Sequence, residues 1–339
     1  MNARIGPPLS WREAAQRLAD PASDEQHSPL VGEPLLVVDF SLAGDADAAD
    51  AARALPALSR LPCPTVALGA RDADRALHAA FDVVLESPAP LEEIRERVGA
   101  APVAAQVLVQ LLRAGRALEI HDALVAESLA YSVLLAGPEF ARWLADRGPA
   151  RAPEPSSSPV IVEREGSRLR LVLNRPERRN AWGMAMRDAC AEALAVALAD
   201  SSVEEIDVRG AGTAFCAGGD LDEFGTLPDA ATAHAVRSTR NVARQLAACS
   251  DRLHFRVHGA CVGAGMELPA FAARVTAAPD AWFQLPELAM GLVPGAGGTA
   301  SLPRRIGRQR TAELALSGRR IEAQTALAWG LVDAIEKGG

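Results

Sequence analysis

Two patterns of apolar residues alternate along this chain, and together they predict a mixed α/β protein. Short apolar runs bounded by glycine, proline or charged residues are typical of buried strands. Segments in which apolar residues recur every three or four positions are typical of helices that cover a sheet. Because strand, turn and helix follow one another in succession, we expect an α/β fold with mostly right-handed crossovers.

The alternation is clearest between residues 160 and 335. VIVEREGSRLRLVLNRP predicts two strands joined by a Glu-Gly turn, and a helix is expected at about 183–200. Three further segments predict strands, namely EEIDVRG, LHFRVHGACVG and RVTAA. Helices are expected to begin at FCAGGDLDEF, within 230–249, at GMELPAFAA and at RRIGRQRTAELALSG.

The first half of the chain has a similar alternation in a less regular form. PLLVVDFSL, LPCPTVALGA and FDVVLES predict strands, and a helix is expected at 46–60. Two longer helices and a short one are then predicted, at 101–117, 121–136 and 138–146.

A segment rich in Pro, Ser and Ala separates the halves. GPARAPEPSSSPV lacks apolar periodicity, which indicates an exposed linker. We therefore predict an N-terminal extension at 1–33, an α/β region ending in helices at 34–147, a linker at 148–159 and a main domain at 160–339.

Composition narrows the function further. The chain has 339 residues, 49% of them apolar, and a formal net charge of -8. An acidic chain without a basic patch argues against nucleic-acid binding. Five cysteines without C-x-x-C spacing and six histidines without an HExxH pattern argue against a zinc site or a disulfide framework. We find no apolar run of membrane-spanning length and no signal peptide, so we expect a soluble, cytoplasmic protein.

Two glutamates stand in glycine-rich frames in the last third of the chain. Glu267 lies in HGACVGAGMELPA, and Glu287 lies in WFQLPELAMGLVPGAGGT. Two carboxylates in one cleft, near backbone N–H groups left accessible by glycine, form a site that moves protons beside a carbonyl group. The structural alternatives are a charge that interacts with a helix dipole for Glu267 and a surface charge for Glu287.

Four segments between residues 160 and 335 carry a family resemblance, namely LNRPERRNAW, AFCAGGDLDEF, HGACVGAGMELPAFA and FQLPELAMGLVPGAGGTASLPRRIG. In this order and spacing they resemble the motifs of the crotonase (enoyl-CoA hydratase/isomerase) superfamily. The resemblance implies a spiral of ββα turns and a thioester carbonyl bound in an oxyanion hole.

The resemblance also implies roles for individual residues. Matched by position, the N–H groups of Gly219 and Ala264 form the oxyanion hole. Glu267 then orients and deprotonates a water molecule, while Glu287 holds the same water and supplies a proton to the α-carbon. The segments after both N–H groups are expected to begin helices, whose positive ends would favour a developing enolate.

A surface for CoA follows from the same matching. Arg179 and Ala181 correspond to the loop that faces adenine, and Asp220 and Leu221 follow the first oxyanion residue. For Asp220 we keep open a purely structural role as a helix N-cap.

Residues 101–151 resemble the helical tail with which crotonases usually end. That tail is expected after GLVDAI, but in this sequence only the four residues 336–339 follow GLVDAI. The earlier segment has the EAL-xxE-like turn of the tail at Asp122 and Glu127. Our hypothesis is that residues 34–151 are a shortened, degenerate crotonase copy whose tail packs on the C-terminal half, in the same chain or in a neighbouring one.

The resemblance implies an acyl-CoA enzyme, and we favour hydration of a 2-enoyl-CoA or the reverse dehydration. It implies a homotrimer or hexamer, and no cofactor or metal beyond the CoA of the substrate. Two alternatives remain. One is an isomerase, decarboxylase or dehydratase that acts on a CoA or carrier-protein thioester. The other, motivated by the unusual N-terminal half, is a non-catalytic scaffold subunit.

Overall fold

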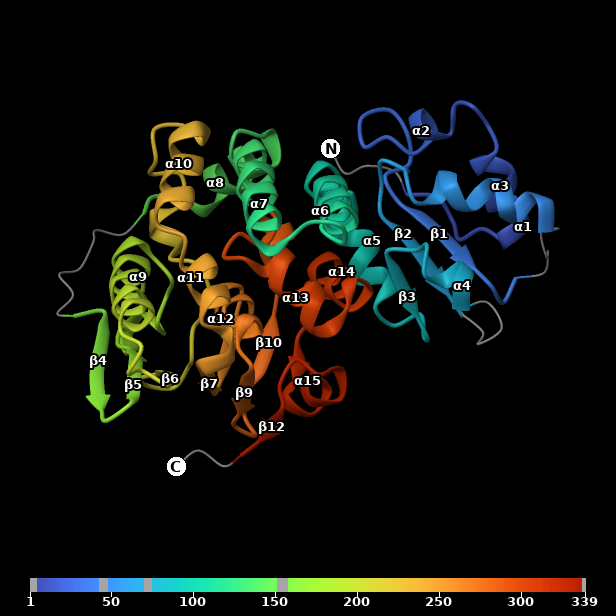
Figure 1. Ribbon diagram of the computed structural model, residues 1–339. Helices are drawn as coiled ribbons and strands as arrows, with labels where there is room; N and C mark the ends of the chain where they lie inside the picture. The colour runs from blue at the N-terminus through green and yellow to red at the C-terminus, as the bar shows by residue number, and fades with distance from the viewer. Residues whose placement is uncertain (1–4, 43–47, 70–74, 151–157, 337–339) are drawn as a thin grey trace.

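The structure is a computed structural model that describes residues 5–42, 48–69, 75–150 and 158–336. Three sheets organise these residues (Figure 1). A small parallel sheet, in the order β1-β2-β3, contains β1 (Leu36–Asp39), β2 (Thr65–Leu68) and β3 (Val83–Leu85). Most of the predicted linker lies outside the described residues.

The largest sheet has six strands in the order β12-β9-β7-β6-β5-β4. They are β4 (Val160–Glu165), β5 (Arg168–Leu173), β6 (Glu205–Gly210), β7 (Leu253–Val257), β9 (Arg274–Ala277) and β12 (Ala334–Ile335). The predicted hairpin β4–β5 is confirmed as its antiparallel pair, and its other pairs are parallel. Alternate residues of β5 are buried beneath the predicted helix α9 (Met184–Ala199).

A third sheet, in the order β11-β10-β8, lies beside the large one. It contains β8 (Ala260–Val262), β10 (Trp282–Gln284) and β11 (Ile321–Glu322). The segment LHFRVHGACVG was predicted as one strand, but it forms β7 and β8 in two different sheets. Gly259 makes the bend, with φ of +54°, and a Cβ atom there would lie 2.2 Å from the carbonyl oxygen of Thr213.

Three predicted helices differ from the structure. The helix expected at 230–249 is broken into α10 (Ala230–Thr239) and α11 (Val242–Ala248), because the side chain of Asn241 accepts a hydrogen bond from Arg244 N and caps a new start. The helix expected after Gly265 is one turn, α12 (Ala264–Glu267), followed by a 3₁₀ turn that begins at Pro269, which has no N–H to extend it. The helix expected in GDLDEF is only a 3₁₀ turn, η3 (Leu221–Glu223).

The small sheet belongs to an N-terminal unit with helices that the sequence analysis had only partly predicted. They are α1 (Trp11–Leu18), α2 (Ser23–Gln26), α3 (Ala48–Leu58), α4 (Arg75–His78) and α5 (Leu91–Ala100). Helix α1 begins with a capping box, in which Ser10 and Glu13 satisfy each other's backbone N–H groups. Trp11, Leu58 and Phe81 are buried in a core separate from that of the main domain.

Three helices, here called the tail helices, connect this unit to the linker. They are α6 (Pro102–Ala114), α7 (Ile120–Leu135) and α8 (Pro138–Arg147), close to the predicted bounds. Helix α7 packs against α10, α11 and α13 (Gly298–Ile306), and α6 packs against α13 and α14 (Arg308–Ser317). The tail helices therefore lie on the C-terminal half of the same chain, with α7 beside α10 in Figure 1.

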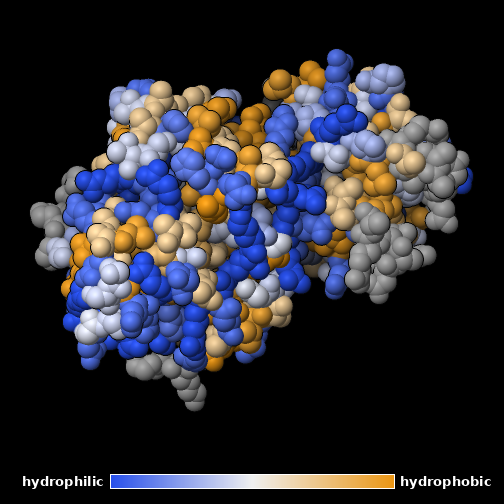
Figure 2. Space-filling view, viewed as in Figure 1, coloured by the Kyte–Doolittle hydropathy of each residue, from blue (hydrophilic) through white to orange (hydrophobic). Residues whose placement is uncertain are grey.

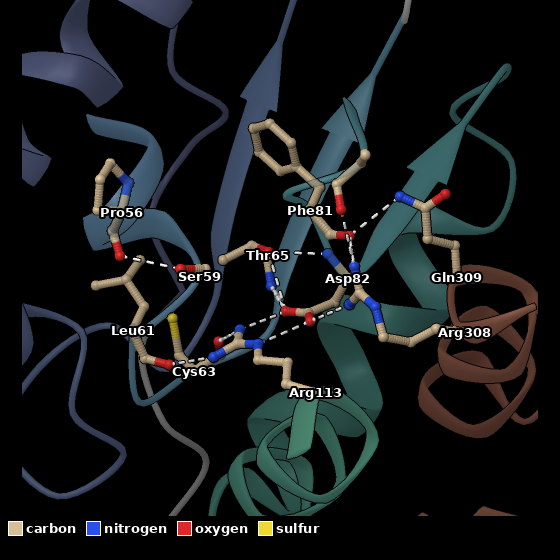
Figure 3. Close-up of polar contacts among 11 residues, drawn as sticks. Pro56, Ser59, Leu61, Cys63, Thr65, Phe81, Asp82, Arg113, Arg308 and Gln309 are labelled. Carbon is tan, nitrogen blue, oxygen red and sulfur yellow. Dashed lines mark hydrogen bonds and ion pairs between the residues drawn. The ribbon is translucent and has the colours of Figure 1, made fainter. Parts of the chain in front are cut away.

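A buried carboxylate joins the N-terminal unit to helix α6 and to helix α14 (Figure 3). Asp82, just before β3, accepts hydrogen bonds from Arg113 at the end of α6 and from Arg308 at the start of α14, at 2.5–2.9 Å. Thr65 N and Oγ1 donate to the same carboxylate. Removing one partner of such a buried network typically costs about 3–5 kcal/mol, so this junction should be rigid.

The surface over the tail helices carries apolar side chains, visible along the upper edge in Figure 2. Leu129 and Val133 on α7 are exposed. No single helix in the described ranges is long and apolar enough to cross a membrane, although the pair α7–α8, bent by 65°, meets those criteria when its two members are taken together.

Candidate active site

The two glutamates meet because they follow neighbouring parallel strands. Strand β8 pairs in parallel with β10, and Cys216 forms a parallel bridge to Cys261 on the other edge of β8. The chain therefore leaves three adjacent extended segments at the same edge. Gly219 follows the first, Glu267 the second and Glu287 the third, which explains how residues up to 68 positions apart come together.

One glycine lies against both carboxylates. A Cβ atom placed on Gly263 would lie 2.5 Å from Glu287 Oε1 and 3.8 Å from Glu267 Oε1. Gly263 also has a φ of +48°, a conformation that glycine adopts without strain. Both carboxylates are buried, and Glu287 Oε2 has no hydrogen-bond partner. The predicted pair therefore faces a single small space.

The residues 295–299, here called the glycine loop, are held between two carboxylates. Ala296 N and Gly298 N each donate to Glu267 Oε2 at 2.8 Å. The alternate N–H groups, of Gly297 and Thr299, donate to the buried Glu127 of α7 at 2.7 and 2.8 Å. Thr299 Oγ1 donates to Glu127 at 2.7 Å as well. One tail helix thus holds the loop that orients Glu267.

The two predicted oxyanion donors are available. Among the described residues, neither Gly219 N nor Ala264 N donates a hydrogen bond to a protein acceptor. Ala264 begins α12, where the first N–H groups of a helix have no internal partner. Because the segment after Gly219 is only a 3₁₀ turn, the dipole contribution expected there is smaller than a full helix would give.

Burial shifts the protonation of the carboxylates. Desolvation raises the pKa of Glu287 to about 8, and it raises the pKa of Glu267 well above its usual value, with the charge of Glu287 adding to the effect. The two hydrogen bonds from the glycine loop oppose this shift at Glu267 by favouring its ionised form. Glu287 has no such donors at Oε2. The hydrogen bonds therefore favour the ionised form at Glu267 more than at Glu287.

These groups line a cavity of about 880 Å³, within the usual range for the binding site of a drug-sized ligand. Of the residues predicted to contact CoA, Asp220 and Leu221 line this cavity, whereas Arg179 is exposed outside it and Ala181 is buried outside it. The Asp220 carboxylate is engaged by Arg175 and by Arg178.

Asp220 also has the structural role of a helix N-cap, the alternative kept open from the sequence. Its carboxylate also accepts from Asp222 N at 3.3 Å and caps η3. With three donors from the protein itself, this side chain has a structural part in the site.

Three wall residues were not predicted as members of the site, namely Glu127, Tyr131 and Arg237. Glu127 and Tyr131 lie on α7 and Arg237 on α10. The sequence had indicated Glu127 only as part of the tail motif. The one signal in the sequence was the resemblance of residues 101–151 to a crotonase tail. No group of three or more His, Cys, Asp or Glu side chains within the described ranges is arranged to hold a metal ion.

Comparison with known proteins agrees with this geometry. The family model described as "Enoyl-CoA hydratase/isomerase" matches residues 163–337. A 2,3-dehydroadipyl-CoA hydratase from Escherichia coli is 38% identical over 175 residues, which cover 52% of this chain and 68% of that protein. A 1,2-epoxyphenylacetyl-CoA isomerase from the same organism is 36% identical over 178 residues, covering 51% and 68%.

Solved structures show the same likeness. AtuE of Pseudomonas aeruginosa is 33% identical, with a TM-score of 0.50 over 53% of this chain and 71% of that one. An enoyl-CoA hydratase from Thermoplasma volcanium has the same identity and TM-score, over 54% and 73%. The chain belongs to the enoyl-CoA hydratase/isomerase family, within the crotonase superfamily. Membership makes it a crotonase-type enzyme and leaves the particular reaction open, since its relatives include hydratases and isomerases.

Proposed function

We propose that this protein adds water to 2-enoyl-CoA thioesters, or removes it in the reverse direction. The observation that carries this proposal is the pair of buried carboxylates facing Gly263, next to two N–H groups without a protein acceptor. Hydration needs a base for the water, an acid for the α-carbon and donors for the thioester oxygen. The site contains one candidate for each role.

The proposed reaction transfers one proton from water to Glu267 and another from Glu287 to the substrate. Glu267 takes a proton from the water while the hydroxyl oxygen bonds to the β-carbon. The double bond shifts to form an enolate, whose oxygen is bound by Gly219 N and Ala264 N. Glu287 then gives its proton to the α-carbon, and the enolate collapses to the 3-hydroxyacyl thioester. A proton passes back from Glu267 to Glu287, through water, before the next turnover.

We also propose the direction from which CoA enters. Asp220 and Leu221 line the cavity next to Gly219, so the pantetheine arm would pass this edge before the thioester reaches the oxyanion donors. Arg179 and Ala181, outside the cavity, would then contact the adenosine end. The step itself needs no metal and no cofactor beyond the CoA of the substrate.

The tail helices are part of the proposed active site. Their packing against α10 and α13, and the hydrogen bonds that the glycine loop donates to Glu127, support the proposal that residues 101–147 serve as the tail of this catalytic domain. That residues 34–147 derive from a degenerate crotonase copy remains a hypothesis. We propose a homotrimer or hexamer as the assembly, which sedimentation measurements will test.

The experiment that tests the function is a screen of the purified protein against enoyl-CoA and 3-hydroxyacyl-CoA thioesters, with mass spectrometry to detect a gain or loss of water. Hydration is expected with the intact protein and is not expected when both glutamates are replaced by glutamine. A change in double-bond position without a change in mass would identify an isomerase instead, an alternative favoured by the isomerase among the relatives. Calorimetry that detects no binding of any CoA thioester would favour a scaffold subunit.

A further inference from the structure

Arg237 brings a positive charge to the cavity wall between α10 and α7. Its guanidinium carbon lies 4.8 Å from the centre of the Tyr131 ring. Its Nε donates to Ser128 Oγ at 3.1 Å, and its Nη2 donates to the carbonyl oxygen of Ser128 at 3.0 Å and to the Ser132 hydroxyl. The guanidinium group of Arg237 is therefore held in place by one face of α7.

All of these partners are neutral. In the described part of the chain, no Asp or Glu oxygen lies within 4.0 Å of the Arg237 nitrogens, and Nη1 donates to no protein acceptor. Other arginines of the cavity wall differ, since Arg187 pairs with Asp188 at 2.8 Å and Arg240 pairs with Glu192 at 3.2 Å. Burial lowers the pKa of the Arg237 guanidinium, and the nearby charge of Glu127 opposes this shift without a direct ion pair among the described residues. The charge of Arg237 is therefore maintained against a desolvation cost.

The position of Arg237 places this charge near the reacting end of the cavity. The Tyr131 ring on which it stacks lies against Gly295, where an added Cβ would come 2.4 Å from the ring. The next residue of the glycine loop, Ala296, donates its N–H to Glu267. One aromatic ring thus separates the cation from the loop that holds the proposed base. Of the residues expected to contact CoA, Asp220 and Leu221 line the cavity on a different segment of the wall, directly after Gly219.

We propose that Arg237 binds a carboxylate at the far end of the acyl group, so that the preferred substrates are thioesters of dicarboxylic acids. This inference rests on the proposed function, because it assumes that the acyl chain extends from the oxyanion donors past Glu267. Nη1 has two N–H groups to donate, and the ring of Tyr131 shields the ion pair from water. A charge-assisted bond in such a place is stronger than one between neutral groups.

A purely structural role for Arg237 would need no charge. A neutral amide has two N–H groups and could donate to two of these three oxygen atoms, so glutamine could also link α10 to α7. The variant Arg237→Gln therefore removes the charge and keeps part of the link. Arg244→Gln is the matched control, because Arg244 is an exposed arginine of the neighbouring α11 and does not line the cavity.

The test compares hex-2-enoyl-CoA with its ω-carboxylated counterpart, and a shorter and a longer pair of the same kind. The measured quantity is the ratio of kcat/KM for the carboxylated substrate to that for the uncharged one. The intact protein should favour the carboxylated member of at least one pair. Arg237→Gln should lower that ratio by about 100-fold, Arg237→Lys should lower it less, and Arg244→Gln should leave it at the wild-type value.

Two outcomes would overturn the inference. One is an intact protein that favours the uncharged member of every pair. The other is an Arg237→Gln variant that loses the same factor with both members. The second outcome can be examined with N-acetylcysteamine thioesters, which lack the phosphates of CoA. If the effect of Arg237→Gln disappears with these substrates, Arg237 is assigned to CoA binding instead.

Binding of the saturated pair, adipyl-CoA and hexanoyl-CoA, separates this inference from the proposed function. Calorimetry measures it without catalysis and with the intact protein. Tighter binding of adipyl-CoA together with no hydration would retain the carboxylate site and reject the hydratase. Hydration together with equal or weaker binding of adipyl-CoA would retain the hydratase and reject the carboxylate site.

Discussion

Replacing Glu127 should affect both the stability of the protein and its turnover. Glu127→Ala leaves three buried donors without an acceptor, namely the N–H groups of Gly297 and Thr299 and the Thr299 hydroxyl. An unsatisfied buried donor costs about 1–3 kcal/mol, and partial relaxation makes about 3–6 kcal/mol a reasonable total. Because natural domains are stable by about 5–15 kcal/mol, this variant should be close to unfolding.

Glu127→Gln is the more informative variant. Its amide oxygen still accepts a hydrogen bond, but its NH₂ group faces N–H and O–H donors of the glycine loop. We therefore expect the free energy of unfolding to fall by about 1–3 kcal/mol. The glycine loop also carries the two N–H groups that bind Glu267, and a displacement of about 1 Å at a catalytic group can lower the rate about 100-fold. We expect kcat to fall by about that factor while KM changes little, because Glu127 is not expected to contact CoA.

Urea unfolding followed by circular dichroism measures the first effect, and steady-state hydration of an enoyl-CoA measures the second. Glu119→Gln is the control, since Glu119 is exposed at the start of the same helix and its side chain makes no cap hydrogen bond. It should change the stability by less than about 0.5 kcal/mol. Wild-type stability in Glu127→Gln would refute the proposed anchoring, and lower stability with a wild-type kcat would refute the proposed positioning of Glu267.

Four further predictions concern the carboxylate pair and the tail helices. Glu267→Gln and Glu287→Gln, assayed separately, should each lower the hydration rate about 10²–10⁴-fold, and an isomerase would gain support if only one of them did so. Because burial raises the pKa of Glu287 to about 8, a pH profile of kcat/KM should fall as the pH rises through about 8, where the acid loses its proton. The same raised pKa means that Glu287 stabilises the folded protein in acid and that this stability is lost as the pH rises toward 8. Urea unfolding should therefore show a smaller loss of stability with rising pH in Glu287→Gln than in the intact protein. Residues 158–339 produced alone should be insoluble or inactive, because they lack the tail helices, and a soluble fragment with full turnover would contradict the proposed role of the tail.

Local patterns predicted most strands and the long helices because these elements follow periodic burial. They also predicted that Glu267 and Glu287 share a site, since each stands in a glycine-rich frame close after an apolar run. The break between α10 and α11 escaped prediction because the apolar period continues across it, and only the capping by Asn241 ends one helix and begins the next. The short α12 was indicated by Pro269, but the apolar pattern around it favoured a longer helix.

For the parts of the site that came from the first half of the chain, the resemblance of residues 101–151 to a crotonase tail was the one signal, and no apolar pattern placed them at the site. Glu127 binds a backbone N–H group 170 positions away, and Arg237 meets Ser128 across 109 positions. A glutamate in a helix looks the same in sequence whether it faces solvent, a loop or a ligand. The same holds for Tyr131, whose ring forms the surface on which Arg237 lies.

The order of the tail helices and the catalytic domain along the chain has a consequence for synthesis in the cell. A ribosome adds about 5–20 residues per second, so α6 and α7 leave it about 10 to 40 seconds before α14 is complete. During that interval the apolar side chains of Leu108, Leu112 and Leu124, all buried in the finished protein, have no C-terminal partner to cover them. The nascent chain is then most exposed to aggregation, and chaperones that bind apolar helices should raise the yield of the active protein more than they raise the yield of the N-terminal unit alone.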